Sequence, residues 1–163
     1  MPINFFDPVC QEQPATAVLF GIVDDQNGTK AFIDTANSEN WIAIVINPNQ
    51  IAVVFTAIDN CVEILRPNGD MESRCDGMLT YPGNIVFVEL KNQRKNWISD
   101  AIDQLETTIR HFFENHDIDR FRRRRAFACN KRHPNFEVLE NERMKRFFDE
   151  SRVRLNVQAE IPI

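Results

Sequence analysis

The sequence predicts an α/β fold in which helices flank a central mixed β-sheet. Residues 85–90 are almost continuously apolar, which is typical of a strand covered on both faces. Residues 97–116 carry apolar side chains at helical spacing, and residues 153–161 alternate strictly between apolar and polar. With 163 residues and neither a linker nor a repeat, we expect residues 1–163 to form a single domain.

The N-terminal third predicts extra strands joined by turns. Apolar runs cover residues 16–23 and 41–46, and an Asp-Gln-Asn-Gly turn at residues 25–28 precedes a short returning strand at 31–33. Residues 51–58 are ambiguous. Their Val-Val-Phe-Thr centre favours a strand, but their apolar residues also keep helical spacing behind an Asn-Pro start, so both alternatives stay open.

The rest of the chain predicts the central elements. We expect a strand at residues 61–65, a returning strand at 71–80, a turn at 82–84 and the apolar strand that follows it. The helix at 97–116 should lead to a short strand at 126–129. A second helix at 137–150 and the alternating strand complete the chain.

Composition excludes several classes of protein. A chain that is 43% hydrophobic, with only 5 Gly and 8 Pro, is neither disordered nor collagen-like. No apolar run reaches the length of a membrane span, so no membrane partner is expected, and no signal peptide is visible. The four cysteines are spaced neither as a zinc site nor as a dense disulfide framework, which favours reduced thiols and a cytoplasmic location.

The charge is distributed unevenly. Residues 1–80 hold 11 acidic and 3 basic side chains, whereas residues 81–163 hold 13 acidic and 16 basic ones. Residues 120–132 contain seven basic residues and no acidic residue, which would suit either a polyanion-binding surface or an ordinary solvated surface. Consecutive arginines in a strand cannot all face one way, so either Arg122 and Arg124 or Arg123 and Arg125 would face a substrate groove. The candidate nucleic-acid contacts are Arg122, Arg124, Lys131 and Arg132.

Three charged residues, Asp76, Glu89 and Lys91, form a candidate catalytic or metal-binding group. Glu89 and Lys91 are two residues apart at the end of the apolar strand and therefore share a face. Asp76 lies on the preceding strand, which the turn at 82–84 folds back beside Glu89. Two converging carboxylates repel unless one is protonated or a cation lies between them, and Mg²⁺ or Mn²⁺ suits oxygen ligands. The alternative is a simple Glu89–Lys91 surface pair at a strand end.

These residues resemble the signature of the PD-(D/E)XK nuclease superfamily, which includes restriction endonucleases and Holliday-junction resolvases. The matching segments are Arg74-Cys75-Asp76-Gly77-Met78-Leu79 and, after it, Glu89-Leu90-Lys91, the only acidic-x-Lys triplet in the chain. The order of predicted strands and helix over residues 61–129 also resembles the family's core. The position that is proline in the family pattern is Cys75 here.

The resemblance implies a restriction-endonuclease-like core over about residues 50–132, preceded by extra N-terminal strands and followed by a C-terminal helix and strand. It implies metal ligation by Asp76, Glu89 and the carbonyl of Leu90, with Lys91 as the catalytic lysine and Gln104 as a supporting residue. Many members carry a further acidic residue before the first core strand. Asp59 and Glu63 are the nearest candidates here, and neither is assigned.

Two functions remain as expectations. The first is a Mg²⁺-dependent endonuclease that hydrolyses phosphodiester bonds, in DNA rather than RNA, and acts with a protein partner or as a homodimer. The second is a non-catalytic interaction protein that keeps the nuclease fold, such as a toxin-neutralising or defence-system subunit. The low isoelectric point favours the second function, because acidic proteins bind DNA poorly in general.

Overall fold

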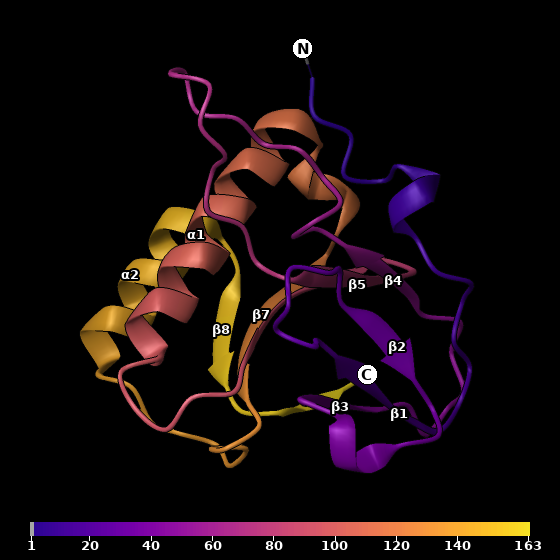
Figure 1. The fold of residues 1–163 in the computed structure, drawn as a ribbon. Helices are drawn as coiled ribbons and strands as arrows, with labels where there is room; N and C mark the ends of the chain where they lie inside the picture. The colour runs from indigo at the N-terminus through magenta and orange to yellow at the C-terminus, as the bar shows by residue number, and fades with distance from the viewer. Residues whose placement is uncertain (1) are drawn as a thin grey trace.

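A five-stranded mixed sheet forms the middle of three layers in the computed structural model, which describes residues 2–163. Its strand order is β4-β5-β6-β7-β8, antiparallel from β4 to β6 and parallel from β6 to β8. The strands span Val54–Ala57 (β4), Gly77–Tyr81 (β5), Asn84–Lys91 (β6), Arg123–Asn130 (β7) and Arg154–Val157 (β8). Helices α1 and α2 cover one face of this sheet (Figure 1).

A second sheet covers the other face. Its order is β2-β1-β3-β9, with β1 antiparallel to both neighbours and β9 parallel to β3. The strands span Leu19–Val23 (β1), Phe32–Asp34 (β2), Ala43–Ile46 (β3) and Glu160–Pro162 (β9). The mixed α/β class and the extra N-terminal strands predicted from sequence are therefore confirmed.

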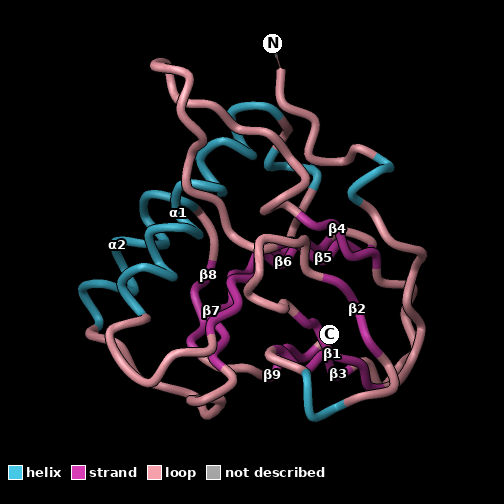
Figure 2. Tube along the Cα trace, in the orientation of Figure 1, coloured by secondary structure: helices cyan, strands magenta, loops and turns pink. Residues whose placement is uncertain are grey.

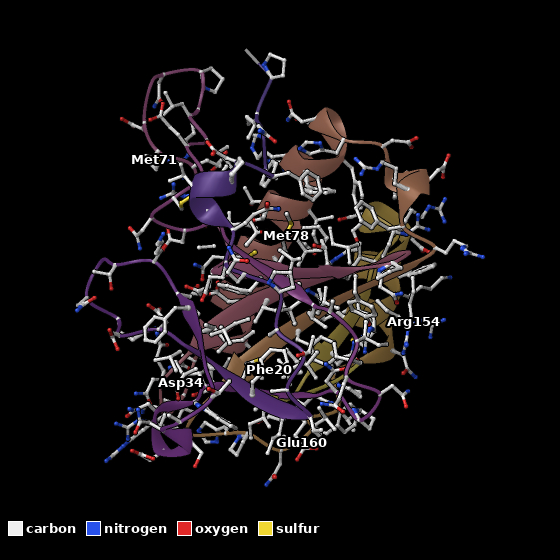
Figure 3. All side chains as sticks on the ribbon, turned by 90° about the vertical axis from the view of Figure 1, so that its right-hand side faces the viewer. Phe20, Asp34, Met71, Met78, Arg154 and Glu160 are labelled. Carbon is white, nitrogen blue, oxygen red and sulfur yellow. A yellow bond between two sulfur atoms is a disulfide. The ribbon has the colours of Figure 1, made fainter. Side chains whose placement is uncertain are left out.

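Strand β6 contributes to both hydrophobic cores. Ile85 and Phe87 point into the core beneath the helices, whereas Val86 and Val88 point into the core between the two sheets. This double burial explains why the strand is almost continuously apolar. In Figure 3, Met78 and Phe20 mark the helix-side core and the inter-sheet core, respectively.

The two helices differ in how well their sequence predicts them. Helix α1 spans Ile98–Asn115 and buries the predicted apolar stripe, so that prediction is confirmed. Helix α2 spans Asn141–Ser151 and begins four residues later than expected. The segment before it remains extended because the Glu137 N–H donates to the Val157 carbonyl instead of entering a helix. Neither helix, nor any other among the described residues, is long and apolar enough to cross a membrane.

The ambiguous segment at 51–58 is a strand, β4, and the strand predicted at 61–65 is wrong. After β4 the chain turns, with the N–H groups of Cys61 and Val62 donating to the Ile58 carbonyl. Only an isolated bridge between Leu65 and Met71 remains, and β5 begins at Gly77 rather than at residue 71. Figure 2 shows this long β4–β5 connection as a loop that projects from the top of the molecule.

The alternating C-terminal segment is two strands rather than one. Its apolar side chains are buried as predicted, but the backbone leaves the five-stranded sheet after Val157. The Ala159 N–H donates to the Pro134 carbonyl, and the Ala159 carbonyl accepts from the Ile44 N–H. The segment therefore joins the two sheets as β8 and β9, a change of partner that an alternating pattern does not reveal.

A disulfide contradicts the expectation of four reduced thiols. Cys10 and Cys61, which are 51 residues apart in sequence, are bonded to each other with a Cα–Cα distance of 5.8 Å. The N-terminal segment reaches Cys61 because it runs along β4, where Gln11 bridges to Thr56. Cys75 and Cys129 are free and buried. Structural disulfides are more typical of oxidising compartments, so the cysteines do not support the cytoplasmic prediction.

We expect the double variant Cys10→Ser/Cys61→Ser to be destabilised by about 4 kcal/mol, because the bond closes a long loop in the unfolded chain. The thermal midpoint should fall by about 10 °C. A reducing agent should shift the wild type similarly and leave the double variant unchanged. Thiol titration of denatured, unreduced wild type should find two thiols; finding four would contradict the disulfide.

Candidate active site

A pair of buried carboxyl groups lies where β5 begins and β6 ends. Gly77 pairs with Val88, and continuing this register by one residue sets Asp76 opposite Glu89. Directly opposed residues in an antiparallel pair project to the same face. Asp76 is 7% exposed and Glu89 is 2% exposed, so both carboxyl groups are almost removed from water.

Hydrogen bonds connect this pair to its neighbours. The Leu90 N–H donates to Asp76 Oδ2 at 2.7 Å, and Lys91 Nζ lies 3.1 Å from Glu89 Oε2. Lys91 Nζ also donates to Gln104 Oε1 on α1 at 2.6 Å. All four side chains expected from the sequence, those of Asp76, Glu89, Lys91 and Gln104, are thus brought together. The surface-pair alternative does not describe them, because Glu89 and Lys91 are largely buried.

Burial makes both carboxyl groups reluctant to ionise, and negative charge nearby adds to the effect, from Asp24 and Asp59 on Asp76 and from Asp76 on Glu89. Burial raises the pKa of Asp76 to about 7, against the opposing effect of the Leu90 N–H. Burial also raises the pKa of Glu89 well above its usual value, and the negative charge of Asp76 raises it further, while Lys91 opposes both effects. A cation between the two groups would offset the repulsion that a proton otherwise relieves.

Asp24 is a further neighbour of this pair that was not predicted from the sequence. Asp24 directly follows β1 and shares a side-chain hydrogen bond with Asp76. Burial raises the pKa of Asp24, and the negative charge of Asp59 also contributes to the rise. Asp59 is held 2.9 Å from Arg74 in an ion pair. In the sequence, Asp24 is part of an Asp-Asp dipeptide at the end of an apolar run, a pattern that indicates the start of a turn equally well.

Cys75 is at a position where the structure requires a backbone N–H. Its backbone N–H donates to Thr108 Oγ1 on α1 at 2.7 Å, deep in the helix-side core. Proline has no N–H and could not make this bond. Gln104 Nε2 donates to the Arg74 carbonyl at 3.2 Å, so two bonds from α1 hold the segment that leads to Asp76.

The donor set fits a small divalent cation. No group of three or more His, Cys, Asp and Glu side chains able to hold a metal occurs among residues 2–163. The carboxyl pair nevertheless offers only oxygen donors, which Mg²⁺ and Mn²⁺ prefer. Glu89 and Asp76 share a side-chain hydrogen bond, which requires a proton on one of the two carboxyl groups, and a cation between them could replace that proton. The remaining ligands would be water and a backbone carbonyl, for which Leu90 is the candidate.

The four candidate nucleic-acid contacts do not form one surface. Lys131 and Arg132 follow β7 at the same end of the sheet as Lys91, and the Lys131 N–H donates to the Lys91 carbonyl. Arg122 and Arg124 lie at the start of β7, beside the β5–β6 turn. Seven residues of strand separate the two groups, about 20 Å.

Arg122 and Arg124 therefore lie apart from the carboxyl pair, and their contact with nucleic acid stays a prediction. A continuous run of basic residues appears as one stripe in sequence, but an extended strand carries its two ends to opposite edges of the sheet. Arg124 is also engaged elsewhere, since its guanidinium donates to the carbonyls of Ile118 and Arg152.

Comparison with known proteins does not identify the chain. No protein-family model, curated protein or solved structure matches it. The assignment of a function therefore depends on the geometry of the carboxyl pair and its neighbours.

We expect Asp76→Asn to leave the thermal midpoint of the metal-free protein unchanged or to raise it by up to about 5 °C, because it removes a buried like charge. The amide oxygen of asparagine can still accept from the Leu90 N–H. Asp103→Asn, an exposed site on α1 with the same change in net charge, is the control. The measurement is differential scanning calorimetry with a chelator present; a large loss of stability would identify Asp76 as a structural residue.

Proposed function

We propose that the protein is a metal-dependent nuclease that hydrolyses phosphodiester bonds, with DNA favoured over RNA. The observation that carries the proposal is the buried Asp76–Glu89 pair with Lys91 on the same face. A chain gains no stability from burying two carboxyl groups against each other, so their placement favours a functional role. Lys91 contacts both Glu89 and Gln104, and this fixed position of the ammonium group also favours a functional role.

The element order supports a restriction-endonuclease-like core. The antiparallel strands β4, β5 and β6 are followed by α1 and by β7, which is parallel to β6. The acidic residues precede β5 and end β6, the positions where the PD-(D/E)XK resemblance puts them. On this proposal the four-stranded sheet and β8 are additions around the core.

Each residue at the site would have a distinct role. A Mg²⁺ or Mn²⁺ ion held by Asp76, Glu89 and the Leu90 carbonyl would supply Lewis-acid activation of water and phosphate. Lys91 would stabilise negative charge on the scissile phosphate or help to deprotonate the attacking water. Gln104 would orient the Lys91 ammonium through the bond between Nζ and Oε1.

Lys131 and Arg132 are the best-placed contacts for a nucleic-acid backbone. Both are exposed, and Arg132 donates to Asn92 Oδ1 in the loop that follows Lys91. Two exposed cations beside a carboxyl pair would hold phosphates without reading sequence. We therefore propose cleavage directed by nucleic-acid structure or by a protein partner, and a homodimer where two strands are cut.

The second candidate is a non-catalytic interaction protein with this fold. The observation that favours it is the acidic surroundings, because Asp24 and Asp59 add negative charge beside Asp76. Such a field disfavours approach of a polyanion in the absence of a cation. A toxin-neutralising or defence-system subunit would use the fold and leave the carboxyl pair without a substrate.

The proposal predicts cleavage of plasmid or oligonucleotide DNA with Mg²⁺ or Mn²⁺ and none with a chelator. Asp76→Asn should abolish both cleavage and the calorimetric heat of Mn²⁺ binding, because it removes one of the two anionic ligands. Asp103→Asn should retain both. Wild-type protein that binds no Mn²⁺ and cleaves neither DNA nor RNA would favour the interaction protein.

Lys91 should separate catalysis from binding. Lys91→Ala should keep Mn²⁺ affinity, and largely keep nucleic-acid affinity, while turnover falls by about 10² or more. Lys91→Arg should restore little, since a planar guanidinium replaces a compact ammonium. Single-turnover cleavage and calorimetry on the same preparations provide the measurements, and cleavage by Lys91→Ala at the wild-type rate would remove this residue from the mechanism.

A further inference from the structure

A cavity lies at the β8 edge of the five-stranded sheet, and most of its arginines are at the opposite end of β7 from the carboxyl pair. Its volume is about 620 Å³, and it extends over the start of β7, the edge strand β8 and the end of α2. Its lining includes six arginines: Arg122, Arg123, Arg124, Arg125, Arg152 and Arg154. Figure 3 shows Arg154 at the edge of the molecule, far from the labelled Asp34.

Three of these arginines project from the same face of the sheet. Arg125 pairs with Arg154 across the parallel β7–β8 ladder, and Arg123 is two residues before Arg125. Like charges opposed across a ladder destabilise the pair. Among the described residues, no carboxylate lies within ion-pair distance of any arginine in the cavity. The fold thus concentrates positive charge in a protein of net charge −5.

Arg125 differs from most arginines because its side chain is almost fully buried. It is only 5% exposed, its Nη2 donates to the Tyr81 hydroxyl at 2.8 Å, and its guanidinium carbon lies 5.4 Å from the centre of the Phe127 ring. Its Nε is buried without a partner. Burial and the nearby charge of Arg123 lower the pKa of Arg125. A buried cation held by a phenol and an aromatic ring, with one donor unused, is well suited to an anionic ligand.

An aromatic side chain adds a second kind of contact. Phe148, near the C-terminal end of α2, lines the cavity and is 40% exposed, whereas the adjacent Phe147 is fully buried in the helix-side core. Phe148 lies on the helix side of the sheet, as do Arg124 and Arg152, which contact each other, so the cavity curves round the edge strand β8 to reach the three arginines on the other face. An aromatic ring and guanidinium groups that line one cavity can contact the base and the phosphates of one nucleotide. The cavity is within the size range of small-molecule sites.

We propose that this arginine-lined cavity binds a nucleotide through two or more of its phosphate groups, with the base against Phe148. The site does not depend on the proposed nuclease activity. Arg125 and Arg123 precede Ala128, the β7 residue that pairs with Glu89, by three and five residues, about 10 to 17 Å along the strand. These arginines require no metal to bind a phosphate. The same phosphate-and-base chemistry could be presented by a free nucleotide or by a nucleic-acid strand, and the proposal commits to the free nucleotide.

The test is isothermal calorimetry with three probes in the presence of a chelator: ATP, inorganic tripolyphosphate and a single-stranded 12-nucleotide DNA. The chelator removes any metal-dependent binding at the carboxyl pair. We expect ATP to bind one site per chain, and tripolyphosphate to bind more weakly to the same site. Arg123→Ala/Arg154→Ala should weaken ATP binding about 100-fold, since each guanidinium–phosphate contact contributes about tenfold.

Matched variants separate this site from general electrostatic attraction. Lys145→Ala/Arg146→Ala removes the same net charge from exposed positions of α2 outside the cavity and should leave ATP affinity within about twofold. Phe148→Ala should weaken ATP but not tripolyphosphate. Equal losses in the two double variants, binding of the DNA strand without ATP, or no binding of any probe would each overturn the proposal. Calorimetric melting of each variant establishes that it is folded.

Discussion

The antiparallel register between β5 and β6 is the constraint on which the candidate active site depends. A shift of one residue would move Glu89 and Lys91 from the helix-side face to the core between the sheets. The register is fixed by the tight turn that joins the two strands, since Tyr81 pairs with Asn84, and a slip would put the polar Glu89 into the apolar core between the sheets. The Leu90 N–H then fixes Asp76 at 2.7 Å, which makes the position of the carboxyl pair a consequence of strand pairing.

The sequence predicted those elements best whose structure depends on a single local feature, such as burial of an apolar face or a short turn. The double burial of β6 and the amphipathic stripe of α1 were each visible as hydrophobic patterns, and the Asp76–Glu89 pairing followed from the short turn between their strands. The remaining features depend on contacts between segments that are distant in sequence, which no local pattern shows. The Cys10–Cys61 bond joins segments 51 residues apart, and the transfer of the C-terminal segment between sheets at Ala159 changes no local pattern. Asp24 was missed for the same reason, since only the packing of one sheet on the other brings it to Asp76.

The basic residues at 120–132 are continuous in sequence but are divided between the two ends of β7 in the fold. Basic residues are concentrated at 120–132, but β7 takes up eight of these positions. The basic residues before and after the strand are therefore too far apart to bind the same phosphate. Lys131 and Arg132 therefore belong with the carboxyl pair, and Arg122 to Arg125 belong with Arg152 and Arg154, which are distant in sequence. The pairing of β7 with β8 brings these arginines together and so concentrates positive charge at this edge of the sheet.

Strand β7 thus connects two sites of opposite charge. At its C-terminal end, Cys129 and Asn130 lie beside Leu90 and Lys91, next to buried carboxyl groups that repel one another. At its N-terminal end, guanidinium groups repel one another without a carboxylate partner. Lys91 and a shared proton partly offset the repulsion at the first end, whereas no carboxylate among the described residues lies within ion-pair distance of the arginines at the second. On the two proposals made above, a cation at one end and a phosphate-bearing ligand at the other would relieve the remaining repulsion.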